Sequence, residues 1–366
     1  MNPNRSGEDN RHIDISRREF LRLGTVGAAG LGFSHRAQLA SAVGGGRCES
    51  VIFLWMQGGV SHLDTFDPKP DAPAEIRGPF RAIGTNVPGI QLCEHLPRMA
   101  RISDKIAFIR SMHHAEGSHE HGMSYMLSGC KPLPGISHPG IGAVVSRTLA
   151  PCGVAPCCIS VSGDGLFQRG SCAAFNLHAE PARISETYGN TALGRKCLAA
   201  RRLVEAGARF VTVEENGWDH HFRAFNSLAN RLPQFDQAVS ALIVDLASRG
   251  LLDKTMVVFA TEFGRSPRIN NEAGREHHAG VFSTFLAGGG ICGGQVVGAS
   301  DARGESAVDS PITPEDLVRT VYHQIGVDAD KKYAQASFGW PLSILNGGRV
   351  ISEVAYGLRG NAQGYA

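Results

Sequence analysis

Histidine, aspartate and glutamate side chains gather at four places in the sequence, each shortly after an apolar run ends. These polar stretches are 57–64, 113–121, 219–221 and 262–278. Imidazoles and carboxylates together bind borderline divalent ions such as zinc or manganese, which activate water or stabilise a phosphoryl group during transfer. A single histidine is more often structural than ligating, but the repetition after four apolar runs predicts a metal site.

The apolar runs that precede these stretches are predicted to be buried strands, because parallel strands covered on both faces read as continuous hydrophobic segments. The predicted strands are 51–56, 105–112, 157–161, 209–213 and 256–260, and a further apolar run covers 281–287. Helix-spaced hydrophobic residues lie between them, at 191–206 and around 235–246. This alternation predicts a doubly wound α/β fold with a largely parallel central sheet and helices on both faces. Ligands bind at the carboxyl ends of the strands in such sheets, so the polar stretches should meet at one edge.

The first 42 residues have the organisation of an export signal. The segment 16–21, SRREFL, is a twin-arginine sequence, and a weakly apolar run (23–33) and small residues at 40–42 follow it. The apolar run is too short to span a bilayer. The arrangement resembles a Tat signal, which exports folded proteins, often with a metal aboard. We therefore expect a periplasmic or secreted protein without a membrane span after signal cleavage.

Net charge, cysteine spacing and the glycine pattern argue against other classes of protein. The formal net charge of +2 over 366 residues gives no reason to expect a nucleic-acid partner. The nine cysteines form no C-x-x-C pair of the zinc-finger type. No strand-linked G-x-G-x-x-G is present, which argues against a dinucleotide enzyme. We expect residues 47–350 to form a single domain and 351–366 a C-terminal tail; the oligomeric state is not determined by the sequence.

Several long motifs resemble those of one protein family. They are WMQGGVSHLDTFDPKP at 55–70, ARRLVEAGARFVTV at 200–213, WDHH at 218–221, TEFGRSP at 261–267, GREHH at 274–278 and LAGGG at 286–290. They resemble a Tat-exported bacterial family that is catalogued as a domain of unknown function, is often labelled sulfatase-like and is grouped with the alkaline phosphatase superfamily. The resemblance covers nearly all of the chain from 47 to about 350 and implies an alkaline phosphatase-like domain.

The resemblance also implies metal ligands. Asp219 and His277 correspond to the strand-end acid and the last metal-binding histidine of the superfamily, and Glu262 to its acid before a glycine. The family's Trp-Asp-Thr-His and Gly-Arg-Asp-His motifs match 218–221 and 274–277, with a histidine for threonine and a glutamate for aspartate. The implied ion is divalent. Zinc or manganese is expected in preference to calcium or magnesium. The candidate ligands are Asp219, His221, Glu262 and His277, with His114 and Asp64 as further candidates.

The sequence departs from the sulfatase pattern in three places. The segment 126–132, MLSGCKP, resembles the end of the nucleophile-bearing helix of sulfatases, and counting back from it places the formylglycine cysteine at His119. We therefore expect no formylglycine mechanism. Gln57 stands where an acid usually ends the first strand, so that metal position is either lost or supplied by Asp64 or His62. The region 158–173 is shorter than usual for the family.

Candidate catalytic residues lie close in sequence to the candidate metal ligands. Ser118 is the candidate nucleophile, and water activated by the metal is an equal alternative. His121 is a candidate further ligand or acid–base group. Arg265 or Arg275 could neutralise developing negative charge, since arginine pairs well with tetrahedral oxyanions.

The leading hypothesis is a secreted metal-dependent hydrolase of phosphate or sulfate esters that acts on a small-molecule or glycan ester. The competing hypothesis is a non-catalytic, metal-bearing envelope protein that binds glycans or partner proteins. Gln57 and the missing nucleophile favour the second, whereas the retained histidines favour the first.

Overall fold

The computed structural model describes residues 47–149, 153, 155–162, 173–334 and 341–355. The predicted export signal (1–42), most of the shortened region 158–173 and residues 356–366 of the predicted tail lie outside this part of the chain. Among the described residues, no helix has both the length and the apolar character needed to cross a membrane.

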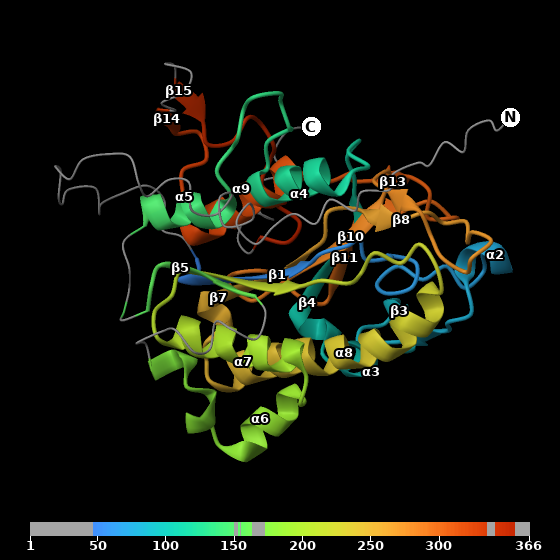
Figure 1. Cartoon of the computed structure of the whole chain (residues 1–366), viewed down its shortest axis with the longest axis horizontal. Coiled ribbons are helices and arrows are strands. Elements are labelled where there is room, and N and C mark those ends of the chain that lie inside the picture. The colour runs from blue at the N-terminus through green and yellow to red at the C-terminus, as the bar shows by residue number, and fades with distance from the viewer. Residues whose placement is uncertain (1–46, 150–152, 154, 163–172, 335–340, 356–366) are drawn as a thin grey trace, which may run out of the picture.

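A seven-stranded mixed sheet forms the centre of the fold (Figure 1). Its strands, in spatial order, are β11 (Gln295–Val297), β4 (Ile106–Met112), β10 (Phe282–Ala287), β7 (Thr255–Ala260), β1 (Ser50–Met56), β6 (Phe210–Glu215) and β5 (Cys158–Val161). The pairs β1–β6, β1–β7, β5–β6 and β4–β11 are parallel, whereas β10 is antiparallel to β4 and β7. The prediction of a largely parallel central sheet is confirmed.

The interior strand β1 is buried on both faces, which explains its unbroken hydrophobic sequence. Val51, Phe53 and Trp55 belong to one core cluster, and the alternate residues Ile52 and Leu54 belong to the other. Alternation along the strand thus divides its side chains between the two layers of the core.

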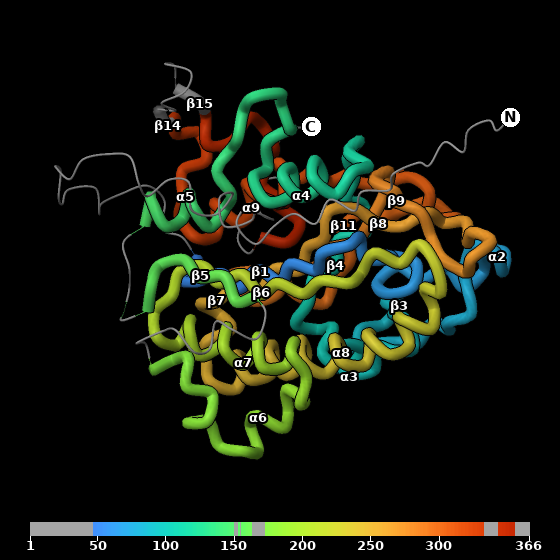
Figure 2. The backbone as a smooth tube through the Cα atoms, in the orientation of Figure 1, coloured from blue at the N-terminus to red at the C-terminus, as the bar shows by residue number. Residues whose placement is uncertain are grey.

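Helices cover both faces of the sheet, as predicted. On one face lie α3 (Pro97–Ala100), α6 (Ala182–Tyr188), α7 (Ala192–Glu205) and α8 (Ala224–Ser248), and on the other α4 (His119–Ser128), α5 (Ile141–Thr148) and α9 (Pro314–Ile325) (Figures 1 and 2). α7 matches the predicted helix and begins where Thr191 accepts a hydrogen bond from the Gly194 amide. α9 begins with a capping box between Thr313 and Asp316.

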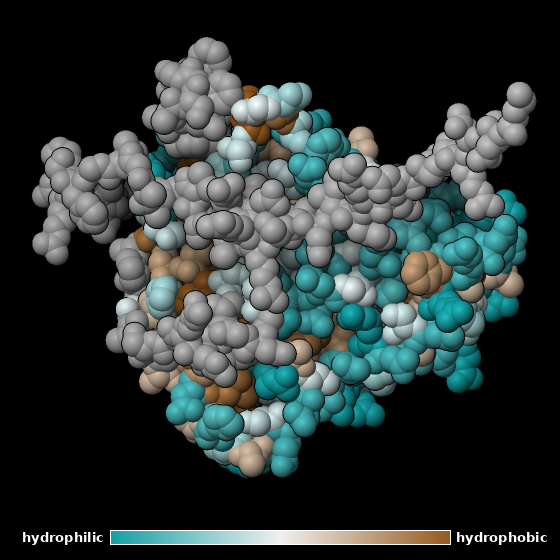
Figure 3. All heavy atoms as spheres, viewed as in Figure 1, coloured by the Kyte–Doolittle hydropathy of each residue, from teal (hydrophilic) through white to brown (hydrophobic). Residues whose placement is uncertain are grey.

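Shorter helices and two-stranded pairs lie outside the central sheet and its main helices. They are α2 (Ala74–Arg77), the 3₁₀ turns at 103–105, 173–175, 177–179 and 252–254, and the two-stranded pairs β2 (Ala82–Gly84) with β3 (Gln91–Cys93), β8 (Gly264–Arg265) with β9 (His277–His278), β12 (Ala299–Ser300) with β13 (Ala307–Asp309), and β14 (Lys332–Ala334) with β15 (Pro341–Ser343). Ile351 and Val354, beyond the predicted domain boundary at 350, are buried in the core. Hydrophilic side chains cover much of the right-hand part of the face in Figure 3.

The reversed strand β10 determines where the loop between β7 and β10 lies. Because β7 and β10 are antiparallel neighbours, the chain leaves β7 and re-enters β10 at the same edge of the sheet. This edge also holds the carboxyl ends of β1, β4 and β6. The polar stretches that the sequence singled out therefore share one edge.

Candidate metal centre

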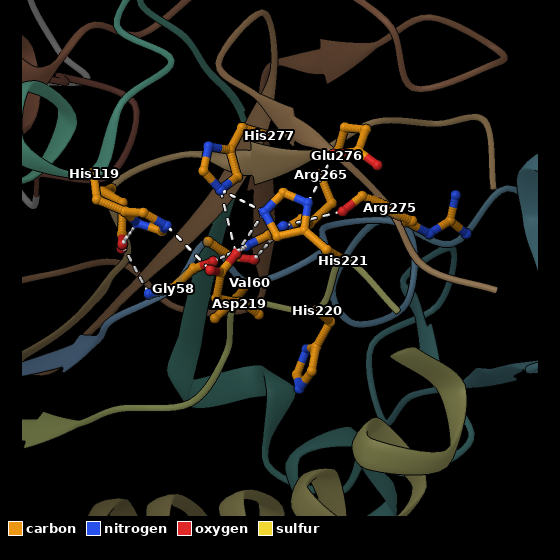
Figure 4. Close-up of polar contacts among 12 residues, drawn as sticks. Gly58, Val60, His119, Asp219, His220, His221, Arg265, Arg275, Glu276 and His277 are labelled. Carbon is orange, nitrogen blue, oxygen red and sulfur yellow. Dashed lines mark hydrogen bonds and ion pairs between the residues drawn. The ribbon is translucent and has the colours of Figure 1, made fainter. Parts of the chain in front are cut away.

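Three histidines surround one aspartate at the carboxyl edge of the sheet (Figure 4). Asp219 and His221 lie in the loop after β6, His277 lies in β9, and His119 is the first residue of α4. The distances from an Asp219 oxygen are 3.0 Å to His221 Nε2, 3.2 Å to His277 Nε2 and 3.4 Å to His119 Nε2. Zinc binds imidazole at about 2.0 Å, so ligand atoms roughly 3 to 4 Å apart can share one ion.

The other ring nitrogen of each histidine, Nδ1, faces a hydrogen-bond acceptor. The distances are 2.7 Å from His119 to Glu262 Oε1, 2.7 Å from His221 to Glu276 Oε2 and 2.9 Å from His277 to the Gly117 carbonyl oxygen. Each Nδ1 therefore has an acceptor behind it, and each Nε2 faces the Asp219 carboxylate. Metal-ligating histidines in proteins usually have such a partner behind them. His119 and His277 hydrogen-bond to Asp219 through Nε2, and the Nε2 atoms of His221 and His277 lie 3.0 Å apart. Burial alone would lower the pKa of His119, but the bonds to Asp219 and Glu262 raise it to about 9, so a bound ion would replace a proton at Nε2.

The two carboxylates behind the histidines differ in environment. The Glu262 side chain is completely buried, and its Oε1 also accepts a hydrogen bond of 2.8 Å from the Gly58 amide. Glu276 is exposed, and Asn270 Nδ2 donates to it at 2.7 Å. The hydrogen bonds from Asn270 and His221 lower the pKa of Glu276, which therefore stays ionised.

A buried arginine also contacts Asp219, at the same oxygen as His221 and His277. Arg265, only 1% exposed, lies 2.5 Å from Asp219 Oδ1 and donates to the carbonyl oxygens of Gly58, Gly59 and Arg275. Although burial alone would raise the pKa of Asp219, the bonds from His119, His277 and Arg265 hold it well below its ordinary value. Asp219 is therefore a permanent anion.

Two glycines let the loops of the centre approach closely. Gly58 has a φ of 129°, and a Cβ there would lie 2.3 Å from the Asp219 amide nitrogen. A Cβ on Gly274 would lie 1.8 Å from the His221 carbonyl oxygen. Only glycine fits at either position, since any side chain would push the ligand-bearing loops apart.

The structure places some predicted site residues in other contacts. Asp64 and Arg275 are buried against each other, with Arg275 Nε 2.7 Å from Asp64 Oδ2. Arg275 also donates to three backbone carbonyls. Its guanidinium therefore holds the surrounding loops together and does not contact the histidines of the centre (Figure 4). His114 Nε2 lies 2.7 Å from the Glu262 backbone carbonyl, and His114 Nδ1 accepts from the Glu116 amide.

The two predicted catalytic residues near the start of α4 also have local partners. Ser118 is the N-cap of α4, and its hydroxyl accepts a hydrogen bond from the His121 amide at 3.4 Å. The His121 ring is exposed and lies 3.5 Å from Glu116. The predicted ligands Asp219, His221 and His277 meet at the centre, and Glu262 reaches it through His119.

Sequence reasoning did not assign roles to His119 and Glu276. The signal for His119 was its place in the sulfatase register, where it replaces the nucleophile. For Glu276 the signal was its place between Arg275 and His277 in the family motif.

The donor set fits a divalent ion. Imidazole nitrogens and a carboxylate oxygen suit borderline ions such as zinc, and each Nδ1 has an acceptor that would hold its proton while Nε2 binds the ion. The four side chains are between 23% and 43% exposed, which leaves the centre open to solvent.

A family model described as "Protein of unknown function (DUF1501)" matches residues 48–153 and 165–355. The match covers more than half of the chain, which therefore belongs to this family. The family expected from the motifs is confirmed. No curated protein matches the chain.

Several solved structures are similar to the chain at low identity. Lipoteichoic acid synthase LtaP from Listeria monocytogenes is 8% identical, with a TM-score of 0.44 over 82% of this chain and 75% of that one. The C-terminal periplasmic domain of EcEptC from Escherichia coli, in complex with Zn, is 9% identical, with a TM-score of 0.40 over 80% and 92%. A protein in the alkaline phosphatase superfamily from Vibrio parahaemolyticus is 11% identical, with a TM-score of 0.42 over 78% and 68%.

Proposed function

We propose that this protein is a secreted, metal-dependent hydrolase of phosphate or sulfate esters that works without a formylglycine nucleophile. The observation that carries the proposal is the convergence of His221 Nε2 and His277 Nε2 on Asp219, with an acceptor within hydrogen-bond distance of each Nδ1. Three protein ligands and solvent access are the arrangement of catalytic zinc sites, which keep a position open for water or substrate.

The residues of the chain divide the work between binding and positioning. Asp219, His221 and His277 would hold the ion, which would supply Lewis acidity toward an ester oxygen and toward water. Glu276 keeps the proton on Nδ1 of His221, so that its Nε2 stays a ligand. The amino-terminal end of α4 borders the centre, and its dipole and free N–H groups favour a negatively charged ester.

Water is the nucleophile that we propose. The position of the sulfatase nucleophile is held by His119, and the Ser118 hydroxyl already accepts a hydrogen bond in capping α4. A nucleophilic Ser118 would have to give up this bond. Replacing Ser118 with alanine separates the two mechanisms: activity should largely survive if water attacks directly, and should be lost if the serine does.

Export and substrate class rest on the sequence and on the openness of the centre. The twin-arginine segment at 16–21 supports Tat export to the periplasm or beyond. The exposure of Asp219 (43%) supports access by a small-molecule or glycan ester rather than confinement of a substrate in a deep pocket.

The test combines metal analysis with ester hydrolysis. Purified protein should contain a divalent ion, preferentially zinc or manganese, and should hydrolyse aryl phosphate or aryl sulfate esters; Asp219→Asn should lose both properties. His178→Gln removes an exposed imidazole in a 3₁₀ turn and should retain both. Metal-replete wild type that turns over no activated phosphate or sulfate ester would refute the proposal.

One observation favours the second candidate, a non-catalytic metal-bearing protein that binds glycans or partner proteins. His119 brings a fourth donor to the same carboxylate, and four protein ligands are typical of closed, structural zinc sites. A metal-replete protein without esterase activity that retains glycans or envelope proteins would support this candidate.

A further inference from the structure

The buried carboxylate of Glu262 forms its ion pair with a histidine, although the charge of the buried Arg265 guanidinium also acts on it. In the described part of the chain, the only ion-pair partner that the structure gives Glu262 is the imidazole of His119. Its other contacts are neutral donors, namely the Gly58 amide and the Thr261 hydroxyl. A completely buried carboxylate is unfavourable unless a positive charge lies near it. Positive charge at His119, carried by a proton on the ring or by an ion bound to it, would stabilise this carboxylate further.

The other side of that ring points into the candidate centre. His119 Nε2 lies 3.4 Å from Asp219 Oδ2, while its Nδ1 is engaged by Glu262. His119, Asp219 and His277 offer ligand atoms that all lie within 4.8 Å of one another. His119 Nε2 thus faces the position where an ion would also meet the predicted ligands.

Packing fixes the direction of the His119 ring. The buried ring of Phe263 has its centroid 5.0 Å from that of His119 and 4.3 Å from that of His277. The His119 and His277 rings meet edge to face at 4.4 Å. A glycine at position 122, one turn along α4, lies against Glu262, because a Cβ there would be 3.2 Å from the Glu262 carbonyl oxygen. The first turn of α4 is thereby pressed onto the end of β7.

We propose that His119 is itself a ligand of the ion and that Glu262 is its positioning residue, so that His119, His277 and Asp219 bind a single ion of the zinc class. A set of imidazole nitrogens with one carboxylate favours zinc or cobalt(II) over magnesium and calcium, which prefer six or more oxygen ligands. The inference uses the ion of the proposed function but does not depend on its hydrolytic activity.

Cobalt(II) titration of the chelator-treated protein tests this assignment, because visible absorption of cobalt(II) is intense at four- or five-coordinate sites and weak at six-coordinate ones. Wild type should bind a single cobalt(II) ion per chain with intense bands. Glu262→Gln retains an acceptor for Nδ1 and should weaken binding by roughly 10- to 100-fold while keeping the bands. His119→Gln should weaken binding further and reduce the bands, whereas His178→Gln should behave as wild type.

A second variant reports ligation directly. His119→Cys would place a thiolate at the ion and should create a near-ultraviolet charge-transfer band with cobalt(II) that wild type lacks. Circular dichroism of each metal-free variant separates loss of a ligand from loss of the fold. If His119→Gln binds cobalt(II) with the affinity and spectrum of wild type, or if folded His119→Cys shows no new band, the assignment is wrong.

The outcome of the ligation test can be distinguished from the outcome of the test for hydrolase activity. Ligation by His119 without turnover of phosphate or sulfate esters would support the inference and refute the hydrolase. Ester hydrolysis with unchanged metal binding in His119→Gln would overturn the inference and leave the hydrolase standing. Inorganic phosphate added to the cobalt(II) protein should change its spectrum if the ion can accept a further ligand in spite of His119.

Discussion

Two charged clusters of the molecule both contain aspartate and glutamate, but the positively charged or basic partners of these acids differ. In the first, the completely buried Arg201 pairs with Glu180 at 2.6 Å and Asp245 at 2.9 Å between α6, α7 and α8. Arg202 and Arg249 add further guanidinium groups to these acids. In the candidate metal centre, the acids face imidazoles, and a single buried guanidinium, that of Arg265, reaches Asp219.

The difference separates a structural cluster from a binding site. Guanidinium groups are always charged and have no lone pair to offer, so the Arg201 cluster is complete in itself. Imidazoles whose Nδ1 faces an acceptor can give up the Nε2 proton to an ion, and the Nε2 atoms of these three rings all face the Asp219 carboxylate. Acids paired with arginine hold the helices together, whereas acids paired with oriented histidines prepare a place for a cation.

The largest effect should come from breaking the structural cluster. Arg201→Met leaves Glu180 and Asp245 buried with fewer counter-charges, and removal of one partner of a buried ion pair destabilises proteins by about 3–5 kcal/mol. Urea unfolding should show this loss. The folded variant should bind zinc as wild type does; a parallel loss of zinc affinity would contradict the separation of the two clusters.

Zinc itself should stabilise the protein through the other cluster. At free zinc about 100 times the dissociation constant, binding to the native state adds about 2.7 kcal/mol to the free energy of unfolding. Thermal unfolding with and without zinc measures this gain. Asp219→Asn keeps an oxygen for Arg265 but loses the ligand charge, so its unfolding midpoint should not respond to zinc; an equal response would place the ion elsewhere.

Acid should reduce the stability difference between wild type and Arg201→Met. Burial alone would raise the pKa of Glu180, but the bonds and charges of Arg201 and Arg202 hold it below its ordinary value of 4.5. The native state then binds fewer protons than the unfolded state, so this stabilisation is present above pH of about 4.5 and is lost as pH falls through the lowered pKa. Unfolding curves from pH 6 to pH 3 should therefore converge; a constant difference would exclude this linkage.

The smallest effect should come from Gly122→Ala. Alanine favours an interior helical position over glycine by about 1 kcal/mol, but its Cβ would crowd Glu262. We expect little change in the free energy of unfolding and a fall in zinc affinity of up to about 10-fold, because Glu262 and the His119 ring would shift together. Isothermal titration of wild type and variant measures it, and unchanged affinity would show that the contact relaxes without moving His119.

The fold could be predicted from the sequence because its signals are local. The hydrophobic run at 51–56, the helix spacing at 191–206 and the Thr313 cap each depend on neighbouring residues alone, and each matches an observed element. The position of β10 between β4 and β7 was not predicted, since strand order depends on contacts between distant segments.

The site could be predicted in part. The motifs identified Asp219, His221 and His277, but within SHEHG the sequence cannot show which side chain faces the sheet. Because α4 begins at His119, that ring points to Asp219, and His121, two positions on, points to Glu116. The partner of Arg275 is Asp64, 211 positions away, and no local pattern reveals such a pair.

The reversal of β10 also bears on how the centre assembles during folding. Glu262 and His277 both lie in the loop between β7 and β10. Within this loop, Arg265 of β8 pairs with His277 of β9 over a short sequence separation. Contacts of this kind form early, whereas His119 and Asp219 arrive only when β4 and β6 have joined the sheet. An ion that needs all of these residues would bind only the finished topology, so metal uptake would report the last step of folding.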